Sequence, residues 1–300
     1  MNGVLLIDKP VGPTSHDVVA RMRQVTRERS IGHAGTLDPR ATGLLVVLLG
    51  KGTRLATLLG GHDKTYEAVL RLGWSTTTDD AAGERMDTPA GPLPSDDELR
   101  EVLRTFSGSF EQMPPQHSAK KVDGYKAYEL ARRDKPVSLK TAKVIAHSMD
   151  FIDREGDLVR LTMHVGSGFY VRSLARDVGE RLGCGAHLHS LRRTRSGPFS
   201  VEAATTLDDA DQLGPLLEPR LIPLADALPD LPAVRLSEGG LARVRHGNPV
   251  GPQLVEGAWA PVDAGLKKVR LLDDTGVLIA LADLRGGMLH PSVVLNDRRA

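Results

Sequence analysis

The order of apolar and polar positions along the chain predicts several β-strands. Residues 44–49 read LLVVLL, a wholly apolar run of strand length, which is typical of a strand buried in a core. Residues 66–72 alternate instead, with Tyr66 on the inner face. Residues 161–165 alternate in the same way, so these segments predict three strands.

Apolar stripes at helical spacing predict two helices in the N-terminal part of the chain. One follows a cap at Thr14 or Ser15 and turns its apolar residues inward, with its arginines outside. The other begins with a capping box of Ser95 and Glu98, and we expect it to stop at Gly108.

A third helix is predicted after the GSG break at residues 166–168. Its apolar stripe runs from Val171 to Leu182. This arrangement places Tyr170 and Arg172 at a strand-to-helix corner, where side chains commonly project into a site.

The order of the elements favours an α+β fold. Strands and helices do not alternate in the regular way of a parallel sheet, so we expect a long mixed, largely antiparallel sheet flanked by helices. A proline-rich linker is predicted at 214–232, between a first domain at 1–213 and a second at 233–300. In the second domain DDTG joins two apolar runs as a hairpin, which predicts a small β-rich unit.

Composition bounds the class of protein. A chain of 300 residues with 40% apolar content can bury a substantial core. No run approaches the roughly 18 consecutive apolar residues that cross a bilayer, and the start MNGVLLIDKP does not resemble a signal peptide. We therefore expect a cytoplasmic protein without a membrane segment. The single cysteine, Cys184, excludes an internal disulfide and a multi-cysteine zinc site, and we expect it to be buried.

The charges are unevenly distributed although the net charge is only +1. Lysines and arginines concentrate in three basic clusters, at 21–29, 120–143 and 192–195, whereas acids dominate residues 79–101. We expect the basic clusters to converge on a phosphate-binding surface and the acidic segment to face away from it. Each cluster taken alone is more typical of a solvated face.

One loop carries the best candidate for catalysis. Residues 32–43, GHAGTLDPRATG, place Asp38 in front of Pro39, which forces it into extended geometry. Gly32 and Gly35 allow backbone to approach a ligand closely. A carboxylate on such a rigid loop suits nucleophilic or base catalysis, although Asp-Pro is also a common turn dipeptide.

These twelve residues closely resemble the active-site motif of the TruB-type tRNA pseudouridine synthases, whose catalytic aspartate lies within a GTLDP or GALDP core. The resemblance covers roughly the first two hundred residues in matching order and spacing. Its further motifs are GVLLIDKPVGPTSHDVV, KTYEA, TTTDDAAGE, PPQHSAKK, GFYVRSLARDVGERLGCGAH and LRR. One departure is His117, where the family often has an aromatic residue.

The resemblance implies a pseudouridine synthase fold with a central cleft, and a PUA-like C-terminal barrel. It implies that Asp38 is the catalytic residue and that Arg172 pairs with it and keeps it ionised. Tyr66 would stack on the target base and later help to remove the C5 proton. Other positions that match substrate-binding residues of the family are His33, Tyr170 and Leu191, with Asp80 as an acid near the pocket.

The implied reaction converts the uridine at conventional position 55, in the T loop of tRNA, into pseudouridine. The N1–C1′ bond breaks and a C5–C1′ bond forms, so the product is an isomer and we expect no cofactor. Asp38 would act as a nucleophile at C1′ or as a base at C2′, and the sequence leaves both routes open. We expect no metal, because the nearest histidine pair, His187 and His189, lacks a further ligand at suitable spacing.

Two alternatives share these features. One is a guide-RNA-dependent pseudouridine synthase of the Cbf5 or dyskerin type, which has the same TLDP motif, and the other is a non-catalytic tRNA-binding chaperone. A hydrolytic glycosidase fits poorly, because it usually needs a pair of carboxylates. The expected partner is tRNA, recognised through its T-arm and acceptor region by a monomer.

Overall fold

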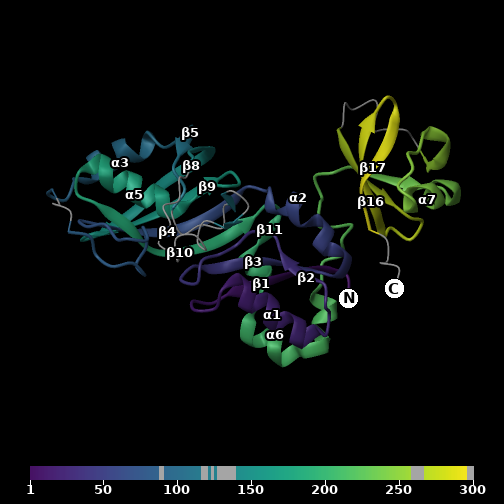
Figure 1. Cartoon of the computed structure of the whole chain (residues 1–300), viewed down its shortest axis with the longest axis horizontal. Coiled ribbons are helices and arrows are strands. Elements are labelled where there is room, and N and C mark those ends of the chain that lie inside the picture. Colours follow the sequence, from purple (N-terminus) through teal and green to yellow (C-terminus); the bar gives the residue numbers. More distant parts are fainter. Residues whose placement is uncertain (88–90, 116–120, 123–124, 127–139, 258–266, 296–300) are drawn as a thin grey trace.

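One long twisted sheet organises most of the chain (Figure 1). The computed structural model describes residues 1–87, 91–115, 121–122, 125–126, 140–257 and 267–295. Helices flank this sheet, and a second, smaller sheet lies at one end of it near the C-terminus.

The main sheet has ten strands and is mixed. Its main path runs in the order β12 (Thr205–Thr206), β1 (Gly3–Lys9), β3 (Thr42–Leu49), β10 (Ala186–Ser196), β4 (Lys64–Leu72), β9 (Leu158–Val165), β8 (Ala142–Glu155) and β5 (Gly108–Gln112). Off this path, β2 (Ile31–His33) pairs with β3 and β11 (Phe199–Ser200) pairs with β10. The pairs β1/β12 and β3/β10 are parallel, whereas the others are antiparallel. The predicted fold class is therefore confirmed.

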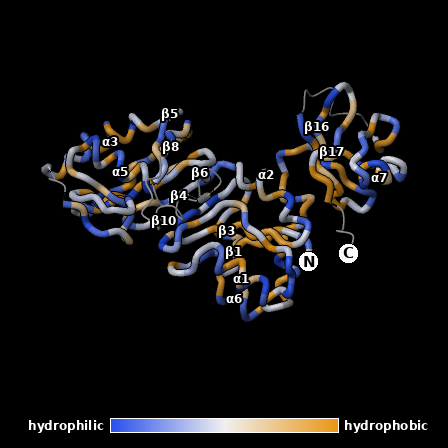
Figure 2. The backbone as a smooth tube through the Cα atoms, viewed as in Figure 1, coloured by the Kyte–Doolittle hydropathy of each residue, from blue (hydrophilic) through white to orange (hydrophobic). Residues whose placement is uncertain are grey.

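The apolar run at 44–49 forms most of β3, and it is buried on both faces. Leu45 and Val47 belong to a core that also holds α1, whereas Leu44 and Val46 belong to a second core on the opposite face. In Figure 2 the hydrophobic colour is concentrated along β1 and β3. A strand covered on both sides has no polar face, and this explains the unbroken apolar sequence.

The two N-terminal helices begin where the capping signals predict. Thr14 caps α1 (Ser15–Thr26) and Ser95 caps α3 (Asp96–Arg104), each in a complete capping box. The predicted stop of α3 is wrong: the helix ends at Arg104, because Phe106 turns into the core. Gly108 instead opens β5, with a φ of 80°.

The third predicted helix is α5 (Val171–Leu182), and it packs with α3 on the face of the sheet that also carries α1. Gly179 brings α5 very close to β10, since a Cβ added there would lie 2.1 Å from the backbone nitrogen of Ala186. Cys184 follows the helix and is buried, as expected. The remaining helices and short strands in the described ranges are η1 (Gly50–Leu55), α2 (Ala56–Gly60), β6 (Lys121–Val122), β7 (Tyr125–Lys126), η2 (Val201–Ala203), α6 (Leu207–Leu213), η3 (Gly214–Arg220), α7 (Glu238–Arg245) and η4 (Pro252–Leu254).

The second sheet has five strands, in the order β14 (Val255–Glu256), β13 (Ala233–Leu236), β15 (Lys268–Leu272), β16 (Leu278–Arg285) and β17 (Met288–Val294). The DDTG segment joins β15 to β16 as the predicted hairpin, with the Asp273 carboxylate accepting from the Thr275 and Val277 amides. Residues before this sheet are not a free spacer, because Leu224 and Leu228 are buried in the core beneath β1 and β3.

Within the described residues, no helix is both long enough and apolar enough to cross a membrane.

The contact between α5 and β10 gives a stability prediction. Gly179→Ala should lower the free energy of unfolding by about 1–3 kcal/mol, because its methyl group would overlap with the backbone of β10. Gly60→Ala is the matched control, since nothing lies within 4 Å of its added Cβ, and it should be neutral or stabilise by up to about 1 kcal/mol. Urea unfolding measures both changes, and equal values for the two variants would contradict this packing.

Candidate active site

Asp38 lies on the loop that joins β2 to β3, residues 34–41, here called the Asp38 loop. Its neighbour Leu37 is fixed by Ser15 of α1, whose hydroxyl accepts from the Leu37 amide at 2.9 Å and donates to the Leu37 carbonyl at 3.1 Å. The Pro39 carbonyl accepts from the Gly12 amide at 2.9 Å. The loop is therefore held on both sides of Asp38, whose side chain remains 40% exposed.

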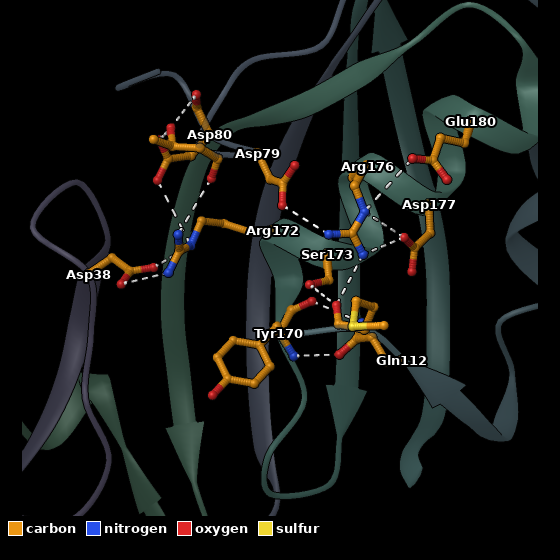
Figure 3. Close-up of polar contacts among 12 residues, drawn as sticks. Asp38, Asp79, Asp80, Gln112, Tyr170, Arg172, Ser173, Arg176, Asp177 and Glu180 are labelled. Atoms are coloured by element: carbon orange, nitrogen blue, oxygen red, sulfur yellow. Dashed lines mark hydrogen bonds and ion pairs between the residues drawn. The ribbon is translucent and has the colours of Figure 1, made fainter. Parts of the chain in front are cut away.

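Arg172, in the first turn of α5, meets this carboxylate with two nitrogens (Figure 3). The Nε–Oδ2 distance is 2.9 Å and the Nη2–Oδ1 distance is 3.3 Å. Its side chain is only 7% exposed, so water weakly screens the pair. A two-pronged contact of this kind fixes the plane of the carboxylate as well as its position.

Asp80 approaches the same guanidinium from another direction (Figure 3). Its Oδ2 lies 3.9 Å from the Arg172 Nε. The other oxygen accepts from the Thr78 hydroxyl at 2.6 Å and from the Ala82 amide at 2.9 Å. Arg172 thus lies between two carboxylates, of which Asp80 is already hydrogen-bonded and Asp38 faces open space.

That space is a cavity of about 250 Å³, large enough for a single nucleobase. Five residues predicted from sequence line it together, and they come from four separate segments: Asp38, Tyr66, Tyr170, Arg172 and Leu191. Tyr66 is buried on β4, on the same face as the inner residues of that strand. A separate small cavity is lined by Asp38, Asp80 and Leu191.

His33 is not among the residues that line the main cavity. It lies on β2, and its ring meets the ring of His16 edge-on at a centroid distance of 6.1 Å. The role that the resemblance implies for His33 stays a prediction. His117, the departure from the family motif, lies outside the described residues.

The start of α5 is anchored by a second polar network (Figure 3). Gln112 donates to the Tyr170 carbonyl at 3.0 Å and accepts from the Tyr170 amide at 2.9 Å. Arg176 bridges Asp79 at 3.1 Å and Asp177 at 2.7 Å. Burial raises the pKa of Asp79, and Arg176 opposes this shift. The acidic segment therefore enters the site at Asp79 and Asp80, contrary to the expectation that it faces away.

Three cations under the site are buried, which the sequence patterns did not predict: Lys9, Lys64 and Arg193, the last of which was assigned to a basic surface cluster. Lys9 and Arg193 are 0% exposed and Lys64 is 7% exposed. Lys9 donates to the carbonyls of Pro10 and Pro13, each at 2.9 Å. A usable signal existed for Lys64, because it alternates in phase with the inner residues of β4.

Burial changes the proton affinity of both lysines. It lowers the pKa of Lys9 to about 8, a shift that the Asp38 carboxylate opposes and Arg193 increases. It also lowers the pKa of Lys64 to about 8, and Arg193 adds to that effect. Lys64 lines the main cavity and donates to the carbonyls of Gly60 at 2.9 Å and His62 at 2.5 Å.

The predicted basic surface needs correction at two of its clusters. Arg193 is wholly buried, and Arg192 forms a two-pronged ion pair with Asp8 at 2.7 and 3.0 Å. Arg21 is paired with Asp211 of α6. The arginine-rich runs therefore include buried or ion-paired side chains as well as free surface charges. Most of the 120–143 cluster lies outside the described residues.

The two segments that meet at this cavity each match the model of a known protein family. Residues 23–171 match the TruB family pseudouridylate synthase N-terminal domain, and residues 172–228 match the tRNA pseudouridylate synthase B C-terminal domain. The chain belongs to the TruB family of pseudouridylate synthases. The two matches meet between Tyr170 and Arg172, so each contributes side chains to the cavity of this TruB-family chain.

Curated relatives match this TruB-family chain over nearly its whole length. The tRNA pseudouridine synthase B of Thermobifida fusca is 44% identical and the alignment covers 98% of each chain. The tRNA pseudouridine synthase B of Solibacter usitatus is 39% identical, with 98% of this chain and 100% of the relative covered.

Solved structures with similar folds include chains from an H/ACA ribonucleoprotein and from a Cbf5-containing complex. A chain from an H/ACA ribonucleoprotein bound to a substrate RNA containing 2′-deoxyuridine has a TM-score of 0.73 and 26% identity, covering 99% of this chain and 86% of that one. A chain from a Cbf5–Nop10–Gar1 complex has the same TM-score and 29% identity, covering 99% and 85%.

Metal chemistry has no candidate ligand set in the part of the chain that the structure describes, where no group of three or more His, Cys, Asp or Glu side chains is arranged to hold an ion. His187 is buried, and its Nδ1 lies 3.1 Å from the Trp74 carbonyl.

The low pKa of Lys64 predicts a pH-dependent stability difference. Below about pH 8 the folded chain holds the Lys64 ammonium group in a buried position, and its desolvation lowers the free energy of unfolding. Between about 8 and 10.5 the folded chain loses this proton while the unfolded chain keeps it. The free energy of unfolding of the wild type should therefore rise relative to that of Lys64→Met as pH increases through this window. Urea unfolding at several pH values measures it, and a constant or shrinking difference would contradict the assignment.

Proposed function

We propose that this chain isomerises uridine to pseudouridine in tRNA, at conventional position 55 of the T loop, with Asp38 as its one catalytic carboxylate and no cofactor. The observation that carries the proposal is the Asp38 carboxylate, held by Arg172 at 2.9 Å on the wall of a base-sized cavity. Membership of the TruB family and the names of its relatives support the reaction and the substrate.

The geometry suits both routes that the chemistry allows. Attack by Asp38 on C1′ would release uracil and form a sugar ester, whereas removal of a C2′ proton would release uracil and form a glycal. Each route needs an ionised carboxylate beside the ribose, and Arg172 holds the Asp38 carboxylate in place at 2.9 Å. The detached uracil then turns and bonds through C5, which displaces the Asp38 carboxylate from the ester or adds to the glycal, whose C2′ regains its proton. Loss of the C5 proton and gain of a proton at N1 complete an isomerisation that consumes no other reagent.

The walls of the cavity supply the surfaces that a flipped base requires. Unstacking a base costs a few kcal/mol, and stacking on an aromatic ring returns about 1–3 kcal/mol. We assign Tyr66, which lines the cavity, to that stacking contact and to the removal of the C5 proton. Tyr170 and Leu191 line the same space. We assign Asp80 to the orientation of Arg172, and His33 to the T loop on the substrate side.

The rest of the chain would bind the body of the tRNA. We propose that the C-terminal sheet acts as a PUA-like module that grips the acceptor region, while loop shape and flipped bases provide specificity in the T-arm. We further propose that the enzyme works as a monomer in the cytoplasm.

Guide-RNA dependence is the second candidate, favoured by the similarity to Cbf5-containing structures. Sequence identity favours the stand-alone enzyme, because the relatives named tRNA pseudouridine synthase B are 39–44% identical whereas the Cbf5-complex chain is 29% identical. Formation of pseudouridine by the pure chain on an unmodified tRNA transcript, with no added RNA, separates the two.

Asp38→Asn should abolish turnover while tRNA binding is largely retained. The amide keeps the shape of the side chain but cannot act as nucleophile or base, so the rate should fall by at least about 10²–10⁴-fold. Carbodiimide mapping of pseudouridine on the transcript measures the reaction, and filter binding measures affinity.

The matched control is Asp153→Asn, which removes an exposed ion pair with Arg160 on β9 and should leave the rate unchanged. Normal turnover by Asp38→Asn would refute the proposed role of Asp38. An Asp38→Asn variant that keeps its full biological output without forming pseudouridine would favour the chaperone alternative.

The basic segment at 120–143 should supply phosphate contacts. Replacing Lys120, Lys121, Arg132 and Arg133 by alanine should weaken tRNA binding and flatten its salt dependence, with the slope falling by about 0.7–0.9 per lost contact. Arg104→Ala on the exposed side of α3 is the control. An unchanged slope in the quadruple variant would show that this segment does not bind phosphates.

A further inference from the structure

Arg193 of β10 is buried at the back of the Asp38 loop, and its donors go to backbone carbonyls. Its Nη2 donates to Gly35 at 3.0 Å and its Nη1 to Thr36 at 3.4 Å. Its Nε donates to Leu44 at 2.7 Å, on β3 just after the loop. One guanidinium thus binds the backbone on both sides of Asp38, at Gly35 and Thr36 before it and at Leu44 after it.

The surrounding backbone is arranged around this side chain. Gly43 pairs with Arg193 in the parallel β3/β10 ladder, and a Cβ there would lie 2.3 Å from the Arg193 carbonyl oxygen. Gly43 also has a φ of +95°, which other residues rarely adopt. Gly35 turns at a φ of +111°, and its Cβ position faces the guanidinium at 3.5 Å. Because the backbone at Gly35 and Gly43 comes so close, the Arg193 guanidinium can reach three backbone carbonyls.

Ser15 holds the loop from α1, the element on its other side. Because it both accepts from and donates to Leu37, the residue directly before Asp38 is fixed at its amide and its carbonyl. Arg193 fixes the two residues before that. The backbone leading to Asp38 therefore has few remaining degrees of freedom.

A buried guanidinium is a poor source of stability, because its desolvation cost is large and carbonyl dipoles compensate it only in part. A function in placing the loop accounts for its position better. The Asp38–Arg172 contact joins two separate elements, and its 2.9 Å geometry requires the loop to be fixed relative to α5. In enzymes generally, a misplacement of about 1 Å at the reacting group can cost about 100-fold in rate.

We infer that Arg193, together with Ser15, is a positioning residue that sets the place of the Asp38 carboxylate. This inference rests on the proposed function and deepens it. Arg193 borders the main cavity, but its side chain is 0% exposed and its donors bind backbone carbonyls. We therefore expect its effect on the rate of the chemical step and not on tRNA affinity. Lysine should not replace it, because Arg193 reaches its carbonyls from three different nitrogens of a rigid guanidinium, whereas an ammonium group donates from a single atom.

The test compares Arg193→Lys with Arg154→Lys. Arg154 is also a largely buried arginine, with a side chain 15% exposed, and it does not line the main cavity. It donates to the carbonyls of Gly156 and Pro94 and pairs with Asp96 at 3.3 Å. Three quantities are measured for each full-length variant: the single-turnover rate of pseudouridine formation on a tRNA transcript, the dissociation constant for that transcript, and the melting temperature.

Arg193→Lys should slow the single-turnover rate by about 100-fold with tRNA affinity unchanged. Both variants should lower the melting temperature by comparable amounts, but Arg154→Lys should leave the single-turnover rate unchanged. Equal rates for the two variants, at temperatures where both are folded, would overturn the inference, and so would a loss of affinity that accounts for the slower reaction.

Ser15→Ala keeps the inference open to refutation if Arg193→Lys does not fold. It removes one hydroxyl group and should slow the single turnover without weakening binding, whereas a wild-type rate would overturn the inference. A wild-type protein that forms no pseudouridine would overturn the proposed function and this inference together. Wild-type activity with unaffected variants would overturn this inference alone.

Discussion

The two-pronged contact between Asp38 and Arg172 is the interaction on which the proposed site depends. It joins a loop between β2 and β3 to the first turn of α5, two elements from different halves of the long sheet. The parallel pairing of β3 with β10 brings those halves together, and α5 leads into β10. A change in either the strand register or the helix position would separate the two charges.

The site combines a rigid support with an open front. Behind Asp38, hydrogen bonds from Ser15, Lys9 and Arg193 hold the backbone. In front of it, the cavity leaves the carboxylate 40% exposed, so a ribose can replace water there. A carboxylate that is fixed in position and still accessible is what a reaction at the sugar requires.

The fold could be predicted wherever one physical signal dominated locally. The apolar run at 44–49, the capping boxes at Thr14 and Ser95, and the DDTG hairpin each correspond to an observed element. The stop at Gly108 failed, because the packing of Phe106 ended α3 earlier. Strand register could not be read from the sequence, since it depends on contacts between distant segments.

The candidate site was predicted in part, and mainly through the resemblance. Asp38, Tyr66, Tyr170, Arg172 and Leu191 do meet at one cavity. Arg193 was misread as surface charge, because a basic residue in an arginine-rich run gives no sign of burial. The charge pattern predicted that the acidic segment faces away, and only the resemblance placed Asp80 near the pocket; in the structure Asp79 pairs with Arg176 and Asp80 approaches Arg172. Such charges are placed by tertiary pairing, which local patterns do not encode.

A crystal structure of the Asp38→Asn variant bound to a tRNA T-arm would test the central claim most directly. The account predicts a flipped uridine in the cavity against Tyr66, with the side chain at position 38 within about 3.5 Å of C1′ or C2′ of its ribose. A target nucleotide that stays stacked in the loop, or whose ribose lies against Asp80 instead, would contradict it.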